Sequence, residues 1–305
     1  MAMIHSAYAQ VAQDAFGTVG TAMITPFAPN GAIDYDAAQV VANYLVQQGN
    51  DMLVVSGTTG ESPTTTDEEK QQLLKVVRSA VGEHVKIVAG VGTNVTSHSI
   101  ELAKQAQSAG ANGLLVVTPY YSKPSQDGIR AHVEMIADST ELPVMLYDIP
   151  GRSGIPMESE TLIRMGEHPR VLAVKDAKGD IAASTDVMTR SDLVYYSGED
   201  ALNLPLMAAG AIGLVSVVGH VAAKELARMV DAVHNNDLMQ ARHVAANLVP
   251  TVDAVMNHMP GVVAAKAALE LAGIIQHRGT RLPVLPATDE QMEFLRSKLD
   301  GFINP

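Results

Sequence analysis

The feature of this 305-residue sequence that most limits its fold is a series of eight short apolar runs with helical patterns between them. The runs are nearly continuous in aliphatic residues, as expected of parallel strands that are buried on both faces. Their spacing of roughly 20–35 residues predicts an α/β fold, the (β/α)8 barrel. An open, doubly wound sheet is the main alternative, and the absence of a GxGxxG motif after any run weakens its dinucleotide-binding form. The runs are Val19–Thr25, Met52–Ser56, Lys86–Ala89, Gly113–Thr118, Val144–Tyr147, Leu172–Lys175, Val194–Ser197 and Gly213–Val217.

The domain organisation follows from where these runs begin and end. The predicted catalytic barrel occupies residues 17–238, and the helical periodicity of residues 239–305 predicts a C-terminal helical region packed on it. Residues 1–16 have neither the basic start nor the long apolar stretch of a signal peptide, so they predict a flexible N-terminal tail.

Several helices carry start signals. Asp34 precedes an apolar-periodic segment that Gly49 ends, and Thr66 with Glu69 has the spacing of a capping box. Ser97 is predicted to open the helix that ends at Gly110.

Charge and composition exclude several classes of function. Lys and Arg number 21 against 33 Asp and Glu, a net charge of −12, which disfavours binding to nucleic acid or to an anionic membrane. The absence of cysteine excludes disulfides, thiolate metal sites and cysteine nucleophiles, and the histidines show no HxH or HExxH spacing. Residues 201–223 carry no formal charge, but their Pro205 and interspersed glycines predict a buried helix, a glycine cap and a buried strand rather than a membrane span.

Chemistry in a barrel gathers at the carboxyl ends of its strands, and Lys175 ends one of the apolar runs. Burial lowers the pKa of a lysine, and the neutral amine can attack a carbonyl to form a Schiff base. The alternative is a lysine that emerges at the strand end and pairs with Asp176 or Asp180. Lys178 is predicted to be solvated.

Hydroxyl groups at other strand ends favour the Schiff-base interpretation. Tyr147, Thr58 and Tyr121 can form a proton relay that adds no negative charge beside an iminium, although each alone is also typical of a structural residue.

Groups suited to substrate carboxylates also lie at strand ends. Thr59 and Gly60 offer small groups and backbone N–H donors, and Arg152 can bind a second carboxylate through two hydrogen bonds or form a surface ion pair. The adjacent Glu199 and Asp200 are interpreted as a helix start rather than as an acid/base pair.

With these residues in view, the sequence resembles the dihydrodipicolinate synthase/N-acetylneuraminate lyase family of class I, pyruvate-dependent aldolases. The resemblance covers nearly all of residues 17–300, and its motifs are highly specific in combination. They are GTTGES at 57–62, VTPYYSKPSQDG at 117–128, YDIPGRSG at 147–154, AVKDAKGD at 173–180 and YSGED at 196–200.

The resemblance implies a role for each matching position. Lys175 is expected to form the imine with pyruvate, Tyr147 to act as general acid/base, Thr58 to relay protons and Tyr121 to reach in from a neighbouring subunit. Binding positions implied in the same way are Thr59 for the pyruvate carboxylate, Arg152 for the carboxylate of the aldehyde substrate, and Gly198 and Val215 beside the lysine.

The resemblance further implies a lyase that condenses pyruvate with L-aspartate 4-semialdehyde on the diaminopimelate route to lysine. It implies a cytoplasmic homotetramer, a dimer of dimers, that needs no cofactor or metal. Two other functions stay open: an aldolase or lyase acting on a sugar acid or keto-deoxy sugar, and a barrel that only binds a keto acid or serves as a scaffold. Lys70 and His98 occupy positions where lysine-inhibited relatives place other residues, so we expect weak or absent feedback by L-lysine.

Overall fold

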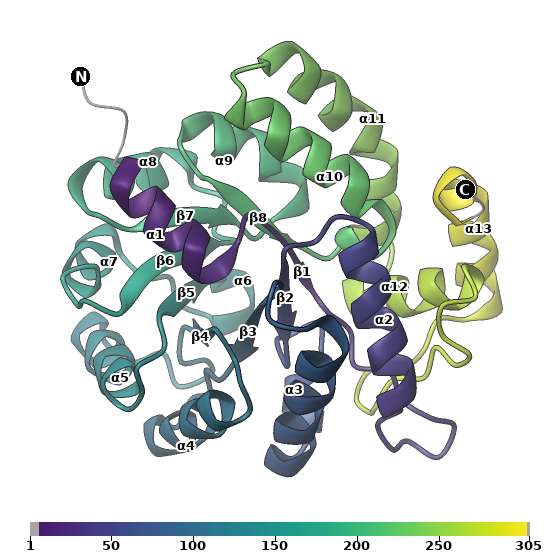
Figure 1. Cartoon of the computed structure of the whole chain (residues 1–305), viewed down its shortest axis with the longest axis horizontal. Coiled ribbons are helices and arrows are strands. Elements are labelled where there is room, and N and C mark those ends of the chain that lie inside the picture. The colour runs from purple at the N-terminus through teal and green to yellow at the C-terminus, as the bar shows by residue number, and fades with distance from the viewer. Residues whose placement is uncertain (1–5, 304–305) are drawn as a thin grey trace. The chain divides into compact units, whose positions relative to one another are not determined.

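Eight parallel strands form a closed barrel in the order β1 to β8 (Figure 1). The computed structural model describes residues 6–303 of the chain. The predicted (β/α)8 fold is confirmed, and the strands lie where the apolar runs predicted them, because side chains on both faces are buried. The strands are β1 Val19–Ala22, β2 Met52–Val55, β3 Lys86–Gly90, β4 Gly113–Val117, β5 Val144–Asp148, β6 Val171–Asp176, β7 Val194–Ser197 and β8 Gly213–Ser216.

Helices alternate with the strands and then continue to the end of the described chain. The α-helices are α1 Ser6–Phe16, α2 Tyr35–Gln47, α3 Asp67–Val81, α4 Thr96–Ser108, α5 Gln126–Asp138, α6 Pro150–Ser153, α7 Ser159–Met165, α8 Ile181–Arg190, α9 Asn203–Ala209, α10 Gly219–His234, α11 Leu238–Met256, α12 Gly261–Leu271 and α13 Asp289–Ile303. Short 3-10 helices are η1 Ser62–Thr64 and η2 Asp200–Leu202.

Two of the three predicted helix starts are confirmed. The Asp34 side chain accepts a hydrogen bond from the Ala37 N–H at 2.9 Å, and Thr66 and Glu69 form a complete capping box. The prediction for Ser97 is wrong, because α4 begins one residue earlier. There Thr93 shapes the entry instead: its hydroxyl accepts from the Val95 N–H, and its own N–H donates to the Ser99 hydroxyl.

The N-terminal prediction is also corrected. Residues 1–5 of the predicted tail lie outside the described residues, but residues 6–16 form α1. Ala12 and Phe16 are fully buried, and the Phe16 ring meets the Tyr196 ring edge-on at 6.3 Å between centroids. A side chain on Gly113 would collide with Phe16. The helix is therefore held by tertiary packing, which the short and weakly patterned segment does not reveal.

The uncharged stretch 201–223 contains α9, a glycine at its end and β8, as predicted. Gly210 adopts φ +131°, a conformation that side chains disfavour. Among residues 6–303 no helix is long and apolar enough to span a membrane. The helical periodicity after residue 238 is confirmed as α11, α12 and α13.

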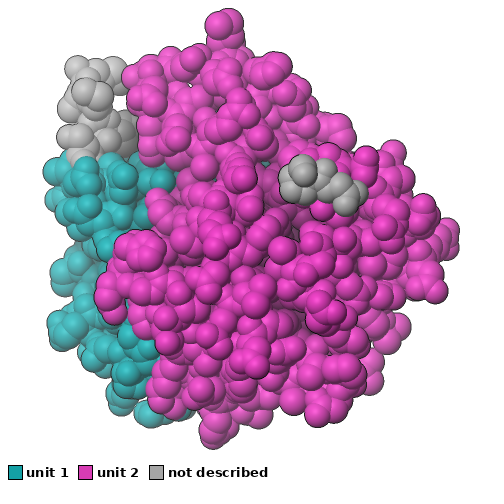
Figure 2. Space-filling view, turned by 45° about the vertical axis from the view of Figure 1, so that its right-hand side comes forward, with its two compact units in different colours: residues 1–18, 86–215 teal, residues 19–85, 216–305 magenta. Residues whose placement is uncertain are grey.

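The chain forms two compact units, shown in separate colours in Figure 2. Unit 1 comprises residues 1–18 and 86–215, and unit 2 comprises residues 19–85 and 216–305. These units do not follow the predicted boundary at residue 238. Unit 1 carries the lysine strand β6 together with its neighbours β5 and β7, and unit 2 carries β1, β2 and the C-terminal helices.

Candidate active site

Lys175 and Tyr147 lie side by side on neighbouring parallel strands of unit 1. They are register partners of β6 and β5, so their side chains lie on the same face of the sheet. Both are buried, and the Lys175 Nζ lies 4.1 Å from the centroid of the Tyr147 ring. The predicted nucleophile and the predicted acid/base are therefore in contact.

The surroundings of Lys175 favour its neutral amine. Burial lowers its pKa to about 8, opposed by the negative charge of Asp200 and reinforced by the positive charge of Arg152. At neutral pH a larger share of this amine is unprotonated than in an exposed lysine, which is the form that attacks a carbonyl.

The loop after β7 leaves room for the lysine only because it carries a glycine. A Cβ on Gly198 would lie 2.8 Å from the Lys175 Cγ and 2.9 Å from its Cε. The Gly198 N–H also donates to the Asp176 carbonyl at 2.7 Å, which ties this loop to the end of β6. Gly198 thus sets the path of the lysine side chain.

Arg152 lies on α6, the short helix that follows β5. Pro150 begins this helix, and Gly154 ends it with φ +81°. The Arg152 side chain is exposed, yet its charge acts on the pKa of Lys175. The guanidinium is thus available to an anion from solvent in the neighbourhood of the buried amine.

Asp176 and Asp180, the alternative partners predicted for Lys175, form hydrogen bonds with other groups. Asp176 accepts hydrogen bonds from the Lys178 N–H at 2.7 Å and from the Ser184 hydroxyl. Asp180 caps α8 by accepting from the Ala183 N–H. These contacts support the nucleophile interpretation over the structural one.

Lys178 is not solvated as predicted. Its side chain is 13% exposed, and its Nζ lies 3.5 Å from the Asp148 Oδ2, where the carboxylate is 1% exposed. Sequence reasoning missed this pair. A signal was available in the sequence, because Asp148 directly follows Tyr147 and Asp176 directly follows Lys175. Successive side chains of a strand point to opposite faces, so both carboxylates lie on the face of the sheet opposite the tyrosine and the lysine.

Two further predicted positions lie elsewhere in unit 1. Tyr121 follows β4 and is 90% exposed, with a backbone φ of +76° that is rare for an aromatic residue. Val215 is buried within β8. Glu199 and Asp200 stand at the start of η2, as predicted, and burial raises the pKa of Glu199.

Thr58, Thr59 and Gly60 form a tight turn directly after β2 in unit 2. Thr58 is exposed and Thr59 is buried. The prediction that the Gly60 N–H is available to a carboxylate is corrected: it already donates to the Gly57 carbonyl at 3.1 Å.

The end of this turn is anchored by a buried ion pair. The Glu61 carboxylate accepts from the Lys266 ammonium of α12 and, at 2.9 Å, from the Arg281 N–H. Glu61 is 3% exposed and Lys266 fully buried. The segments around α12 therefore hold the turn that carries both threonines.

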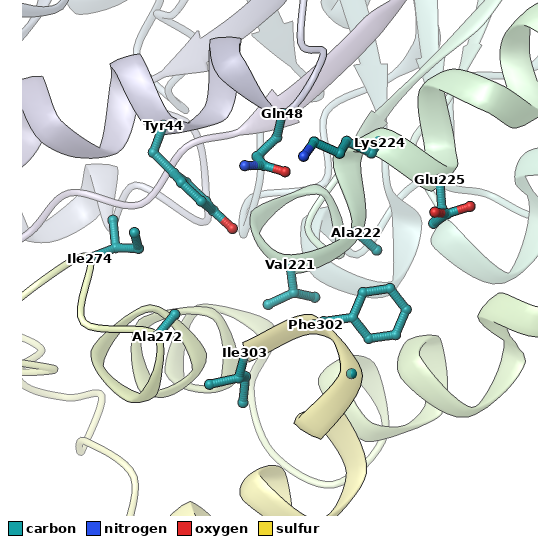
Figure 3. A pocket seen from close by; sticks show the side chains of 11 residues that line it. Tyr44, Gln48, Val221, Ala222, Lys224, Glu225, Ala272, Ile274, Phe302 and Ile303 are labelled. Atoms are coloured by element: carbon teal, nitrogen blue, oxygen red, sulfur yellow. The ribbon is translucent and has the colours of Figure 1, made fainter. Parts of the chain in front are cut away.

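A separate cavity of about 270 Å³ lies in unit 2 among α2, α10 and the end of α13 (Figure 3). Polar groups of Tyr44, Gln48 and Lys224 line one side of it, with Val221 and Ile303 among its apolar residues. None of the predicted site residues lines this cavity.

Comparison with known proteins places this geometry in a family. The model of the dihydrodipicolinate synthetase family matches residues 15–301. A 4-hydroxy-tetrahydrodipicolinate synthase from Kineococcus radiotolerans is 57% identical over 284 residues, 93% of this chain and 92% of that one.

Solved structures agree with the sequence comparison. A dihydrodipicolinate synthase from Bacillus anthracis has a TM-score of 0.90 and 42% identity, covering 93% of this chain and 98% of that one. The enzyme from Cyanidioschyzon merolae, solved with lysine bound, has a TM-score of 0.89 and 39% identity, covering 94% and 98%. A family match over residues 15–301 and relatives this similar establish that the chain belongs to the dihydrodipicolinate synthetase family.

Proposed function

We propose that this chain condenses pyruvate with L-aspartate 4-semialdehyde, as a 4-hydroxy-tetrahydrodipicolinate synthase. The observation that carries the proposal is the buried Lys175 amine, whose pKa is lowered to about 8 and which contacts the Tyr147 ring. Membership of the family supplies the substrates, and the geometry supplies a nucleophile suited to a class I aldolase.

The proposed reaction begins with attack of the neutral Lys175 amine on the carbonyl carbon of pyruvate. Loss of water from the carbinolamine gives the imine, and its iminium form acidifies the pyruvate methyl group. Removal of a methyl proton leaves an enamine, which forms a carbon–carbon bond to the aldehyde carbon. The amine of the second substrate then attacks the imine carbon, closing a ring and releasing Lys175.

Each of these steps moves a proton, and the proposed relay consists of hydroxyl groups. Tyr147 is the proposed general acid/base, and the face of its ring lies 4.1 Å from the Lys175 Nζ. Thr58 passes protons to and from it, and Tyr121 completes the relay from a neighbouring subunit. A phenol or an aliphatic hydroxyl adds no negative charge beside the iminium, unlike a carboxylate.

The two substrate carboxylates are assigned to different groups. We propose that Thr59 binds the pyruvate carboxylate, and that Arg152 binds the carboxylate of the aldehyde. Gly198 and Val215 form walls beside the lysine. Arg152 is exposed, as expected of a group that meets the second substrate from solvent.

The assembly and organisation are proposals as well. We propose a cytoplasmic homotetramer built from two tight dimers, with residues 17–238 as the catalytic barrel and residues 239–305 as its helical addition. The 90% exposure of Tyr121 supports a role outside its own subunit.

The deciding experiment is borohydride reduction in the presence of pyruvate, followed by peptide mass mapping. We expect the label on Lys175, and none in Lys175→Ala, while Lys104→Ala, which changes an exposed lysine of α4, keeps full labelling. Label on another residue would contradict the mechanism.

The second substrate is tested by turnover. We expect activity with pyruvate and L-aspartate 4-semialdehyde and none towards N-acetylneuraminate. The reverse result would assign the chain to the sugar-acid lyases, and trapping without any turnover would indicate a protein that only binds the keto acid.

Weak or absent inhibition by L-lysine is part of the proposal. Lys70 is buried, donates to the Thr65 carbonyl at 2.6 Å and lies 3.8 Å from the Asp67 carboxylate. This ammonium would repel the ammonium of a bound lysine. Tight binding of L-lysine in a calorimetric titration would contradict this proposal.

A further inference from the structure

The Asp148 carboxylate links the two ends of the loop that carries Arg152, and the Gln126 side chain of α5 also binds the far end of this loop through the Pro156 carbonyl and the Glu158 N–H. One oxygen of Asp148, at the end of β5, accepts a hydrogen bond from the Met157 N–H at 3.1 Å. This bond joins the two ends of the segment 148–157, which contains α6 and Arg152. The other oxygen, Oδ2, accepts no hydrogen bond from the described residues and faces the ammonium of Lys178 at 3.5 Å.

Lys178 comes from the loop that follows Lys175, and this second loop is held by hydrogen bonds of its own. Its N–H donates to Asp176 at 2.7 Å, and Asp176 also accepts from the Ser184 hydroxyl of α8. Asp180 caps the same helix. The backbone of Lys178 is therefore held in place, and its side chain extends to the Asp148 carboxylate at the start of the Arg152 loop.

The charges around Asp148 show how much its ionised form depends on Lys178. Burial and the like charge of Asp176 on β6 disfavour the Asp148 carboxylate, while Lys178 favours it, and the pKa of Asp148 is raised to about 6. The hydroxyl of Tyr195 on β7 is also buried near these carboxylates, and burial, followed by their negative charges, raises its pKa. Lys178 is thus the cation that opposes the loss of this charge.

We propose that Asp148 and Lys178 are positioning residues for the aldehyde substrate, because their ion pair fixes the Arg152 loop against the loop that follows the nucleophile. The inference rests on the proposed function. It assigns no contact with substrate to either residue. Their effect reaches the reaction through the placement of the Arg152 guanidinium.

The proposal predicts different effects on the kinetics of the two substrates. Lys175 and Tyr147 lie on strands whose register is set by backbone hydrogen bonds, so the placement of the nucleophile and its neighbour does not depend on the ion pair. Arg152 lies on the loop itself, and a small displacement of a substrate-orienting group has large kinetic effects. Loss of the pair should therefore raise KM for the aldehyde and leave the pyruvate step nearly unchanged, since burial rather than Arg152 is the main cause of the lowered pKa of Lys175.

The test uses three variants of the full-length protein: Lys178→Met, Asp148→Asn and the double variant. Asparagine keeps an acceptor for the Met157 N–H and removes the charge. We expect each single change to raise KM for L-aspartate 4-semialdehyde about tenfold, with borohydride trapping by pyruvate at the wild-type rate. Because both act on one pair, the double variant should match either single variant rather than multiply their effects.

Controls distinguish the proposal from a general loss of structure. Lys178→Arg should restore most of the lost affinity for the aldehyde, and Lys104→Met should leave both substrates unaffected. Equal changes in KM for both substrates, or effects that multiply in the double variant, would overturn the inference. Failure of the wild-type protein to trap pyruvate or to turn over would instead overturn the proposed function.

Discussion

At the residue scale, the reactivity of Lys175 follows from burial, which disfavours its charge, and from contacts that favour it. Burial removes water from the ammonium and lowers its pKa, while the Tyr147 ring face and the Asp200 carboxylate favour the charge. The balance leaves a pKa of about 8. An exposed lysine with a pKa near 10.4 would be almost fully protonated at neutral pH.

This pKa predicts the pH dependence of imine formation. The amine attacks only when neutral, so the rate of pyruvate trapping should rise with pH and level off above about 8. Rapid-quench borohydride trapping at saturating pyruvate measures this rate. A profile that keeps rising to pH 10 would show a lysine with an unperturbed pKa.

A glycine sets the position of that amine. In Gly198→Ala the new methyl group would lie 2.8 Å from the Lys175 Cγ, 2.9 Å from its Cε and 3.1 Å from the Asp176 carbonyl oxygen, so the flexible lysine side chain must move most. We expect turnover to fall about 100-fold with little change in thermal stability. Gly301→Ala is the matched control, because its added methyl meets no atom within 4 Å. Wild-type turnover in Gly198→Ala would contradict this assignment.

At the scale of elements, the turn after β2 depends on a helix far along the chain. Glu61 adopts φ +55°, and its buried carboxylate is held by Lys266 of α12 and by the Arg281 N–H. The Arg281 guanidinium in turn binds Glu69, the capping residue of α3, at 2.6 Å. One cluster therefore holds both the turn that carries Thr58 and Thr59 and the start of the following helix.

Breaking this pair should destabilise the fold strongly. Lys266→Met leaves the Glu61 carboxylate buried without its cation, which costs about 3–5 kcal/mol of unfolding free energy. The double variant Glu61→Gln/Lys266→Met should recover most of it, since glutamine still accepts from the Arg281 N–H. Urea unfolding measures both, with Lys104→Met as the exposed control. Equal stability of the single and double variants would show that the pair does not act as a unit.

At the scale of the whole molecule, Tyr121 connects the barrel to the proposed assembly. Its side chain is 90% exposed and its backbone is held at φ +76°. An exposed aromatic residue in an unfavourable backbone conformation is typical of a residue with a functional role. The proposed dimer supplies that role by offering Tyr121 to a neighbouring site.

Mixing two defective variants tests that arrangement. Tyr121→Phe and Lys175→Ala should each be nearly inactive alone. If Tyr121 serves the neighbouring subunit, a mixed dimer has one intact site, and random co-assembly should restore about a quarter of wild-type activity. If Tyr121 acts within its own subunit, mixing restores nothing.

The sequence by itself determined the barrel and predicted where its chemistry lies. Buried parallel strands need continuous apolar runs, so the eight runs predicted eight strands, and Lys175 at the end of one predicted a nucleophile near other strand ends. The helix caps at Asp34 and Thr66 could also be predicted, because each cap binds a residue only three positions along the chain.

Only the tertiary structure decided what depends on residues distant in sequence. It showed α1 docked through Phe16, Lys178 paired with Asp148 instead of solvated, and Glu61 held by Lys266. It also showed Gly198 making room for Lys175. Each of these contacts joins segments that are distant in the sequence, and no hydrophobic periodicity predicts which of them meet. The two ion pairs also depend on burial, which strengthens the interaction between charges and exists only in the packed fold.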